Sequence, residues 1–259
     1  MPHNPASAPG LVSFVGAGPG DPELLTIKGR KAIENAALVL YAGSLVPRAV
    51  VDCASPDARV VDSAPLTLEE CHNLVRHTAL QGQNVARVHT GDPSLFGALR
   101  EQAALLNADG IPWRVIPGVT AACAAAAAAG LSFTIPEAAQ SLIICRAEGR
   151  TPVPEAQQPG ALAAHGAPLA VYLSSGSAST LQAQLLHNLP PHTPVLCAHR
   201  VGWPGEQLHW TKLEDLAQCV TDNHLKRQTI FLVLPSHHTP GVPSRLYAAD
   251  FSHACREKK

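Results

Sequence analysis

Residues 11–29 have the sequence LVSFVGAGPGDPELLTIKG, and this stretch is the strongest indication of the fold. Its first part, Leu11–Val15, is an apolar run typical of a buried strand. In the turn that follows, the glycines let the backbone bend sharply and Pro19 fixes the bend. A strand, such a turn and then a helix form a ligand crevice at the carboxyl edge of an α/β sheet. The stretch therefore predicts an α/β fold with a binding loop at residues 16–20.

The spacing of these glycines argues against a dinucleotide-binding loop. That motif requires G-x-G-x-x-G, in which the third glycine packs the helix against the strand. Here the spacing is G-x-G-x-G, and Asp21 stands where the third glycine would be. Its carboxylate would repel a pyrophosphate held at the helix N-terminus. Taken alone, the loop is equally compatible with a glycine turn that binds no ligand.

Two more loops of the same kind follow predicted strands. The strand Asn84–His89 leads into Thr90–Gly97, TGDPSLFG, and the strand Trp113–Ile116 leads into Pro117–Ala122, PGVTAA. With these three loops in this order, the chain resembles the tetrapyrrole methylases, which are S-adenosylmethionine-dependent enzymes of corrin and sirohaem synthesis. The resemblance extends over about residues 11–236.

The pattern of predicted elements changes near Pro136. Before it, strands and helices alternate, which predicts a mostly parallel sheet. After it, strands outnumber helices, which predicts a mixed sheet. In the first half we expect further strands at Ala37–Tyr41 and Arg59–Asp62, a capping box at Thr67–Glu70, and helices at residues 68–79, 95–107 and 121–130. In the second half we expect strands at Ser141–Ala147, Leu169–Ser175, Pro194–Val201, Gln207–Leu213 and Gln228–Pro235, and helices at Ser177–Asn188 and Leu213–Leu225.

The domain organisation is predicted as two α/β domains between two tails. We expect a flexible tail at residues 1–10, an N-terminal domain at 11–118, a C-terminal domain at 119–240 and a second tail at 241–259. The resemblance implies the two-domain tetrapyrrole methylase fold, with a mostly parallel N-terminal sheet, a mixed C-terminal sheet and the cofactor in the cleft between them.

Composition excludes several classes of function. The 259 residues have a formal net charge of −1, with 15% charged and 46% hydrophobic residues, as in a soluble globular protein with a large core. There is no basic block for nucleic acid, and prolines and glycines interrupt the long uncharged stretches at 115–136 and 156–199, so no membrane span is predicted. Residues 1–10 lack the cationic and apolar regions of a targeting peptide.

The cysteines and histidines do not have the spacing of a metal site. No C-x-x-C or H-E-x-x-H motif occurs, so we expect no bound metal and interpret the cysteines as small buried hydrophobes. An odd number of cysteines without a signal peptide suits a reducing cytoplasm. The seven cysteines are Cys53, Cys71, Cys123, Cys145, Cys197, Cys219 and Cys255.

The resemblance implies that S-adenosylmethionine is the cofactor and S-adenosylhomocysteine the product. The methyl group is already activated, so catalysis consists mainly of aligning it with a carbon nucleophile and keeping water out. Asp92 is the candidate polar anchor, and its alternative role is that of a turn residue before Pro93. By resemblance the cofactor-binding positions are Pro19, Thr90, Gly91, Asp92, Leu95, Thr120, Ala121, Leu173 and Val201.

Two segments, YAGSLV at 41–46 and RAEGRTPVP at 146–154, resemble the branch of the family that acts on precorrin-4 at C-11. In the uroporphyrinogen methylases an aspartate typically stands where this chain has Ala42, which counts against that activity. The substrate carries many carboxylates, which Arg146 and Arg150 could bind in a bidentate manner. The alternative is a solvated loop, and Tyr41 could simply be a core residue. The candidate substrate-binding residues are Tyr41, Ser44, Arg146, Glu148 and Arg150, and no catalytic base is assigned.

Other functions stay open at this point. The substrate could be the cobalt-bound form of the anaerobic route, or another precorrin methylated at C-17 or C-20. Related folds methylate ribosomal RNA or a translation factor, which the near-zero net charge disfavours. A tetrapyrrole carrier would bind S-adenosylhomocysteine without turnover. By resemblance we expect a cytoplasmic homodimer that acts on a small tetrapyrrole.

Overall fold

The structure is a computed structural model that describes residues 8–237, 242–244, 248 and 251–252. Most of the two predicted tails, at 1–10 and 241–259, lies outside these residues. The described chain forms two compact units, which we call the first and the second unit. The first consists of the residues up to Ala124 together with Arg200–Gly205, and the second of Ala125–His199 and the residues from Glu206 onward.

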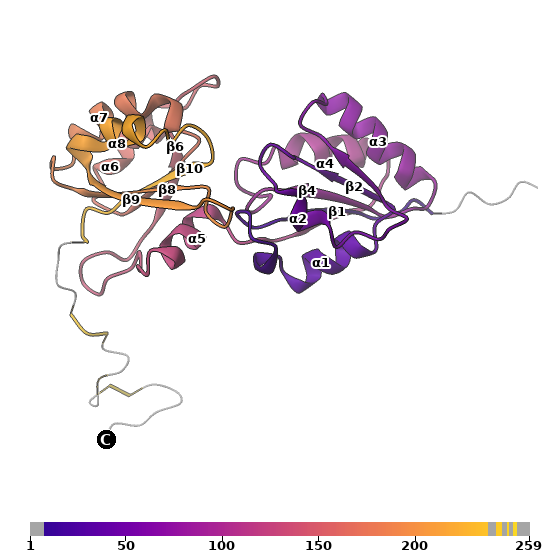
Figure 1. The fold of residues 1–259 in the computed structure, drawn as a ribbon, viewed down its shortest axis with the longest axis horizontal. Helices are drawn as coiled ribbons and strands as arrows, with labels where there is room; N and C mark the ends of the chain where they lie inside the picture. The colour runs from indigo at the N-terminus through magenta and orange to yellow at the C-terminus, as the bar shows by residue number, and fades with distance from the viewer. Residues whose placement is uncertain (1–7, 238–241, 245–247, 249–250, 253–259) are drawn as a thin grey trace, which may run out of the picture. The chain divides into compact units, whose positions relative to one another are not determined.

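The first unit is built on a five-stranded sheet with the order β3-β2-β4-β1-β5 (Figure 1). All its strand pairs are parallel, as the alternation of strands and helices predicts. Its elements are β1 (Val12–Gly16), α1 (Ile27–Glu34), β2 (Leu38–Tyr41), α2 (Arg48–Val51), β3 (Arg59–Asp62), α3 (Leu68–Leu80), β4 (Val85–His89), α4 (Leu99–Ala108) and β5 (Trp113–Ile116). A last helix, α5 (Ala121–Ala128), runs across the point at which the two units divide.

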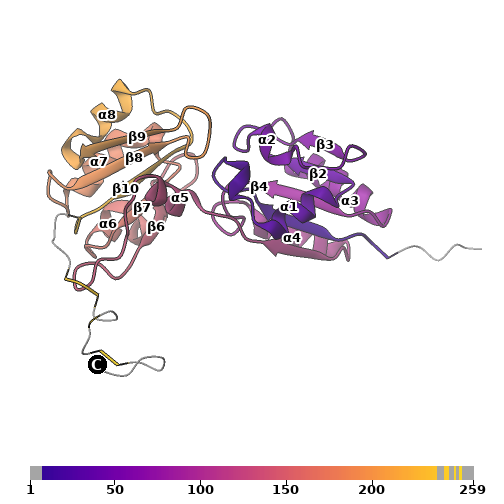
Figure 2. The same ribbon diagram turned by 60° about the horizontal axis from the view of Figure 1, so that its bottom comes forward.

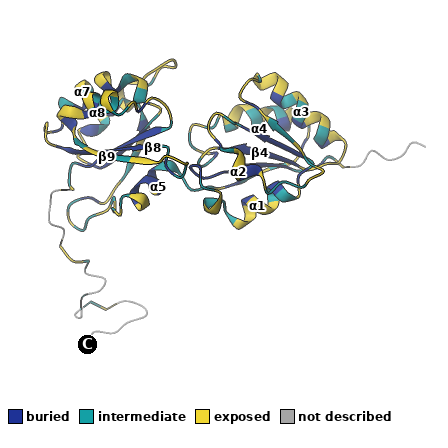
Figure 3. Cartoon of the chain, in the orientation of Figure 1, coloured by how far each residue is buried: buried dark blue, intermediate teal, exposed yellow. Residues whose placement is uncertain are grey.

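Alternating side chains of β1 divide the core of the first unit into two layers. Val12 and Phe14 pack with Cys71 and Leu106 on the face that α3 and α4 cover. Val15 packs on the opposite face, which α1 and α2 cover. Figure 3 shows the strands as the buried centre and the outer sides of the helices as exposed. All five residues of β1 are buried, because helices cover both faces of the sheet, and this explains the near-continuous apolar run of the strand.

The helix boundaries confirm one sequence prediction and correct another. Thr67 and Glu70 form the predicted capping box, and α3 begins at the next residue after Thr67. By contrast, the helix predicted at 95–107 begins only at Leu99. Phe96 and Ala98 have φ angles of 55° and 49°, in the left-handed region that a right-handed helix excludes.

The second unit contains a mixed sheet with the order β6-β7-β10-β8-β9 (Figure 2), which confirms the prediction for this half. Only the pair β6–β7 is parallel, and the other pairs within this sheet are antiparallel. Leu181 and Leu185 of α7 and Leu216 of α8 pack on Val171 and Phe231 of the sheet. The elements are β6 (Ile143–Arg146), α6 (Pro159–Ala163), β7 (Leu169–Tyr172), α7 (Ala178–Leu186), β8 (Pro194–His199), β9 (Gln207–Lys212), α8 (Leu216–Asp222) and β10 (Thr229–Val233).

All five strands of this sheet end one to three residues before their predicted ends, and for β7 and β8 the cause is visible in the backbone. The residues that follow them, Leu173 after β7 and Arg200 after β8, have φ angles of 55° and 53°. A left-handed residue turns the backbone out of the extended conformation, so each strand ends there. No helix in the described part of the chain is long and apolar enough to span a membrane.

Candidate functional site

Three glycine-containing loops come together at one edge of the parallel sheet. They follow the carboxyl ends of β4, β1 and β5, which are neighbours in the sheet. The loops after β1 and β4 are joined directly, because Gly18 N donates to Gly91 O at 3.2 Å and Gly91 N donates to Gly18 O at 2.7 Å. Both glycines have positive φ angles, 74° and 60°, which other residues adopt only with strain.

The loops are so close that side chains are excluded from parts of them. A Cβ atom on Gly118 would lie 2.2 Å from the carbonyl oxygen of Gly91, and one on Gly16 would lie 2.4 Å from Gly118 N. A Cβ on Gly91 would meet nothing closer than 3.9 Å, so space is open on that side of its backbone. The three loops therefore present bare backbone at the carboxyl edge of the sheet, where ligands of open α/β sheets bind.

Asp92 ties the second loop to the third. Its Oδ2 atom accepts a hydrogen bond from Gly118 N at 2.9 Å, and its Oδ1 atom accepts bonds from the backbone N–H and the hydroxyl of Ser94. Partial burial raises the pKa of Asp92, but the hydrogen bonds from Ser94 and Gly118 outweigh it and hold the pKa below its ordinary value. The carboxylate thus serves as a turn residue and also as the bridge between two loops.

A segment from far along the chain packs on the first loop. Trp203 donates from Nε1 to the carbonyl oxygen of Pro19 at 3.0 Å, and a Cβ atom on Gly20 would lie only 2.2 Å from Trp203 Cδ1. The Arg200 guanidinium lies 5.4 Å from the centre of the Trp203 ring, a cation–π contact. We call Arg200–Gly205 the tryptophan clamp. Sequence reasoning used this segment only for Val201 and missed Trp203, because the sequence does not show that this indole reaches Pro19.

The candidate cofactor residues are distributed unevenly between the units. Eight of the nine belong to the first unit: Pro19, Thr90, Gly91, Asp92, Leu95, Thr120, Ala121 and Val201. Leu173 belongs to the second unit, where its side chain is 69% exposed. An exposed leucine at a left-handed position is unusual, and burial in a core does not explain it.

The candidate substrate residues also belong to both units. Tyr41 ends β2 and is buried, and Ser44 is exposed in the loop that follows. In the second unit Arg146 donates to the carbonyl oxygens of Thr151 and Pro152 at 3.1 and 2.8 Å, so it closes its own loop.

The same loop leaves two charged groups at its surface. Glu148 accepts a bond from Gln158 at 3.1 Å, and Arg150 is exposed with no hydrogen bond or ion pair to the described residues. Arg150 is therefore better placed than Arg146 to bind a carboxylate from outside.

His89 lies buried at the end of β4, directly before the second loop. Burial, with a smaller contribution from the charge of Arg87, lowers its pKa from 6.5 to about 3. Its Nε2 atom has no hydrogen-bond partner among the described residues. The imidazole is therefore neutral at physiological pH. Within the described part of the chain, no three His, Cys, Asp or Glu side chains gather as they would around a metal ion.

Comparison with known sequences gives consistent matches. The family model for tetrapyrrole (corrin/porphyrin) methylases matches residues 11–217. The chain is 38% identical over 249 residues to a cobalt-precorrin-4 C(11)-methyltransferase of Priestia megaterium, with 94% of this chain and 96% of that protein covered. It is 40% identical over 246 residues to a precorrin-4 C(11)-methyltransferase of Pseudomonas aeruginosa, with 95% and 98% covered.

Comparison with solved structures agrees. A cobalt-precorrin-4 methyltransferase superimposes with a TM-score of 0.84 at 39% identity, covering 86% of this chain and 94% of the other. A uroporphyrin-III C-methyltransferase from Thermus thermophilus, solved in complex with S-adenosylhomocysteine, gives a TM-score of 0.70 at 28% identity, covering 86% and 92%.

Proposed function

The chain belongs to the tetrapyrrole (corrin/porphyrin) methylases, and on this basis we propose that it transfers a methyl group from S-adenosylmethionine to C-11 of precorrin-4, giving precorrin-5 in cobalamin biosynthesis. The observation that carries this proposal is the 40% identity, over 95% of the chain, to a protein with that name. The segments at 41–46 and 146–154, which resemble the same branch of the family, point the same way.

We propose that the three loops of the first unit hold the cofactor. The residues fit this role, because the loops present bare backbone and leave open space beside Gly91. A methylase of similar fold was solved with S-adenosylhomocysteine. We assign the cofactor contacts to Pro19, Thr90, Gly91, Asp92, Leu95, Thr120 and Ala121, with Leu173 and Val201 completing the set.

The chain's own contribution to the reaction is alignment. S-adenosylmethionine supplies, when bound, a methyl group that is already activated on its sulfonium. Asp92 holds two loops at a fixed distance, and Trp203 fixes the direction of the Pro19 carbonyl. A rigid site of this kind accelerates transfer by holding the reacting atoms in line and excluding water. The neutral, buried His89 adds no charge that would compete with the sulfonium.

The substrate contacts are proposed for the polar groups of both units. Arg150 pairs with one substrate carboxylate, because its guanidinium is exposed and unpaired among the described residues. Arg146 holds the loop on which Arg150 lies. Tyr41, Ser44 and Glu148 complete the candidate set.

A turnover assay tests the proposal. The purified protein is mixed with enzymatically generated precorrin-4 and 13C-methyl-labelled S-adenosylmethionine, and the product is examined by mass spectrometry and carbon NMR. We expect one labelled methyl group at C-11. Cobalt-precorrin-4 is tested in parallel, because the relative from Priestia megaterium is named for that substrate. Binding of S-adenosylhomocysteine without transfer to either substrate would refute the substrate assignment while keeping the cofactor site.

We also propose that the protein is a cytoplasmic homodimer. Six of its cysteines lie in the described residues and none of them forms a disulfide there, as in a reducing compartment, while Cys255 lies outside those residues. Two-fold homodimers are the commonest soluble oligomers. Light scattering coupled to gel filtration measures the mass, and a value near one chain would rule out the dimer.

A further inference from the structure

The first unit contains a groove of about 490 Å³ that is separate from the glycine loops. It lies between α1 and the strands β1 and β5. Leu11 and Asn84, which line it, directly precede β1 and β4, whereas the glycine loops follow the carboxyl ends of these strands. The groove therefore runs along α1 from its first residue, Ile27, to the opposite edge of the sheet. No residue of the three glycine loops lines it, and the proposed methyl transfer makes no use of it.

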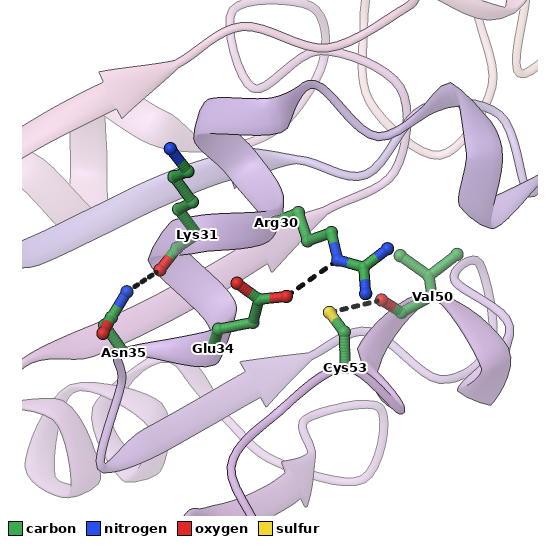
Figure 4. Close-up of polar contacts among 6 residues, drawn as sticks. All are labelled: Arg30, Lys31, Glu34, Asn35, Val50 and Cys53. Carbon is green, nitrogen blue, oxygen red and sulfur yellow. Dashed lines mark hydrogen bonds and ion pairs between the residues drawn. The ribbon is translucent and has the colours of Figure 1, made fainter.

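The groove carries positive charge that the described residues do not compensate. Lys28, Lys31 and Arg114 line it together with polar and apolar groups, and no acidic side chain does. None of the three forms an ion pair within the described part of the chain. Arg30 on the same helix is different, because it pairs with Glu34 at 2.7 Å. Figure 4 shows Lys31 pointing away from that pair, on the other side of α1.

Two of the polar groups are oriented by contacts with the protein. Arg114 donates from Nε to the hydroxyl of Ser13 at 3.0 Å, and Ser13 is only 4% exposed. The two terminal nitrogens of the guanidinium are left to bind an oxyanion in a bidentate manner. Asn84 accepts a bond from Leu11 N through Oδ1 at 3.0 Å, so its amide group is the donor that remains.

We propose that this groove binds a small organic anion with at least two carboxylate or phosphate groups and an apolar part. The charged groups would bind the oxyanions. Ile27 lines the groove and is 77% exposed, and its side chain would contact the apolar part of the ligand. The volume is in the usual range for small-molecule sites. A protein partner is disfavoured, because lysine is depleted in the centres of protein interfaces.

Isothermal titration calorimetry at constant ionic strength tests the proposal with two probes, inorganic pyrophosphate and citrate. Tighter binding of pyrophosphate identifies the natural ligand as phosphorylated, and tighter binding of citrate identifies it as a polycarboxylate. We expect Lys28→Gln and Lys31→Gln each to weaken the preferred probe about tenfold. Arg114→Lys, which keeps the charge but loses the planar fork, should weaken it to a similar extent.

Arg30→Gln is the matched control, because it removes the same charge from the same helix on the opposite side. It should change the affinity less than about twofold. Failure of both probes to bind would overturn the proposal, as would equal weakening by Arg30→Gln and Lys31→Gln. A change in oligomeric state in the groove variants, with unchanged affinity for the probes, would show instead that the groove is an interface between copies of the chain. These readouts do not depend on methyl transfer, so they are independent of the proposed function.

Discussion

Replacing Gly20 by alanine tests the contact between the first glycine loop and the tryptophan clamp. The new Cβ atom would lie 2.2 Å from Cδ1 and 2.5 Å from Nε1 of Trp203. Carbon atoms in contact are normally about 3.5–4.0 Å apart, so the loop or the indole must move by more than 1 Å. The indole is rigid and is held by its bond to Pro19. Overpacking of this kind lowers the free energy of unfolding by roughly 1–3 kcal/mol, and we expect about 2 kcal/mol here.

A double-mutant cycle separates this clash from other effects of the substitution. Trp203→Ala removes one hydrogen bond and the packing of a partly buried indole, for a loss of about 2 kcal/mol. In the double variant the alanine at position 20 meets no ring, so the total loss should stay near 2 kcal/mol instead of about 4 kcal/mol. The coupling energy is then about 2 kcal/mol, well above the error of such cycles.

Urea unfolding followed by far-ultraviolet circular dichroism measures the four free energies. Gly176→Ala is the control, because a Cβ at that position meets nothing within 4 Å and its φ is not in the left-handed region. It should change stability little and should not couple to Trp203→Ala. If the losses of the two single variants add to within about 0.5 kcal/mol in the double variant, the contact between the loop and the clamp does not exist in solution.

Three further predictions concern the proposed site. Gly118→Ala places a Cβ atom 2.2 Å from the backbone oxygen of Gly91. Because a backbone atom cannot rotate away as a side chain can, the loops must move apart, and we expect binding of S-adenosylhomocysteine to weaken at least about tenfold in calorimetry. Unchanged binding would contradict the loop geometry. His89 has a pKa lowered to about 3, so only the unfolded chain takes up its proton between about pH 6.5 and pH 3, and stability should fall in that range as the pH falls, by about 1.4 kcal/mol per pH unit. The variant His89→Gln should show a correspondingly shallower dependence on pH, and an identical slope would disprove the assignment. Arg150→Gln should raise KM for the tetrapyrrole about five- to tenfold with kcat nearly unchanged. Arg146→Gln, which opens the loop, should also lower thermal stability. Equal effects of the two variants on KM and on stability would contradict the separate roles of Arg150 in substrate binding and of Arg146 in loop closure.

Much of the fold could be predicted because local signals and long-range packing agree. The apolar run at 11–15 forms most of β1, an interior strand of the first sheet, and the capping box at Thr67 and Glu70 starts a helix in the predicted place. The start of α4 was predicted wrongly, because the sequence TGDPSLFG has no feature that reveals left-handed angles at Phe96 and Ala98. Those angles occur where the loop packs closely on His89. A Cβ atom on Gly97, between the two residues, would lie 3.2 Å from Nδ1 of His89.

The candidate site was predictable to the extent that it depends on glycine. Three loops with close-packed backbones require residues without side chains, and this requirement is visible in the sequence. The contribution of Trp203 was not visible, because its bond joins residues 184 positions apart in the chain. The internal role of Arg146 was missed for a related reason: the sequence shows a positive charge but not the two carbonyl groups that the guanidinium binds.

The tryptophan clamp has a consequence for biosynthesis of the chain. The first unit takes nearly all its residues from the N-terminal half, yet its last six, Arg200–Gly205, are inserted between two strands of the second unit. A nascent chain folds domain by domain as it leaves the ribosome. Here the first unit cannot be completed until residue 205 has emerged. The hydrogen bond from Trp203 to the Pro19 carbonyl therefore forms only after much of the second unit has been synthesised. Cutting the chain at a single position therefore cannot separate the two units intact.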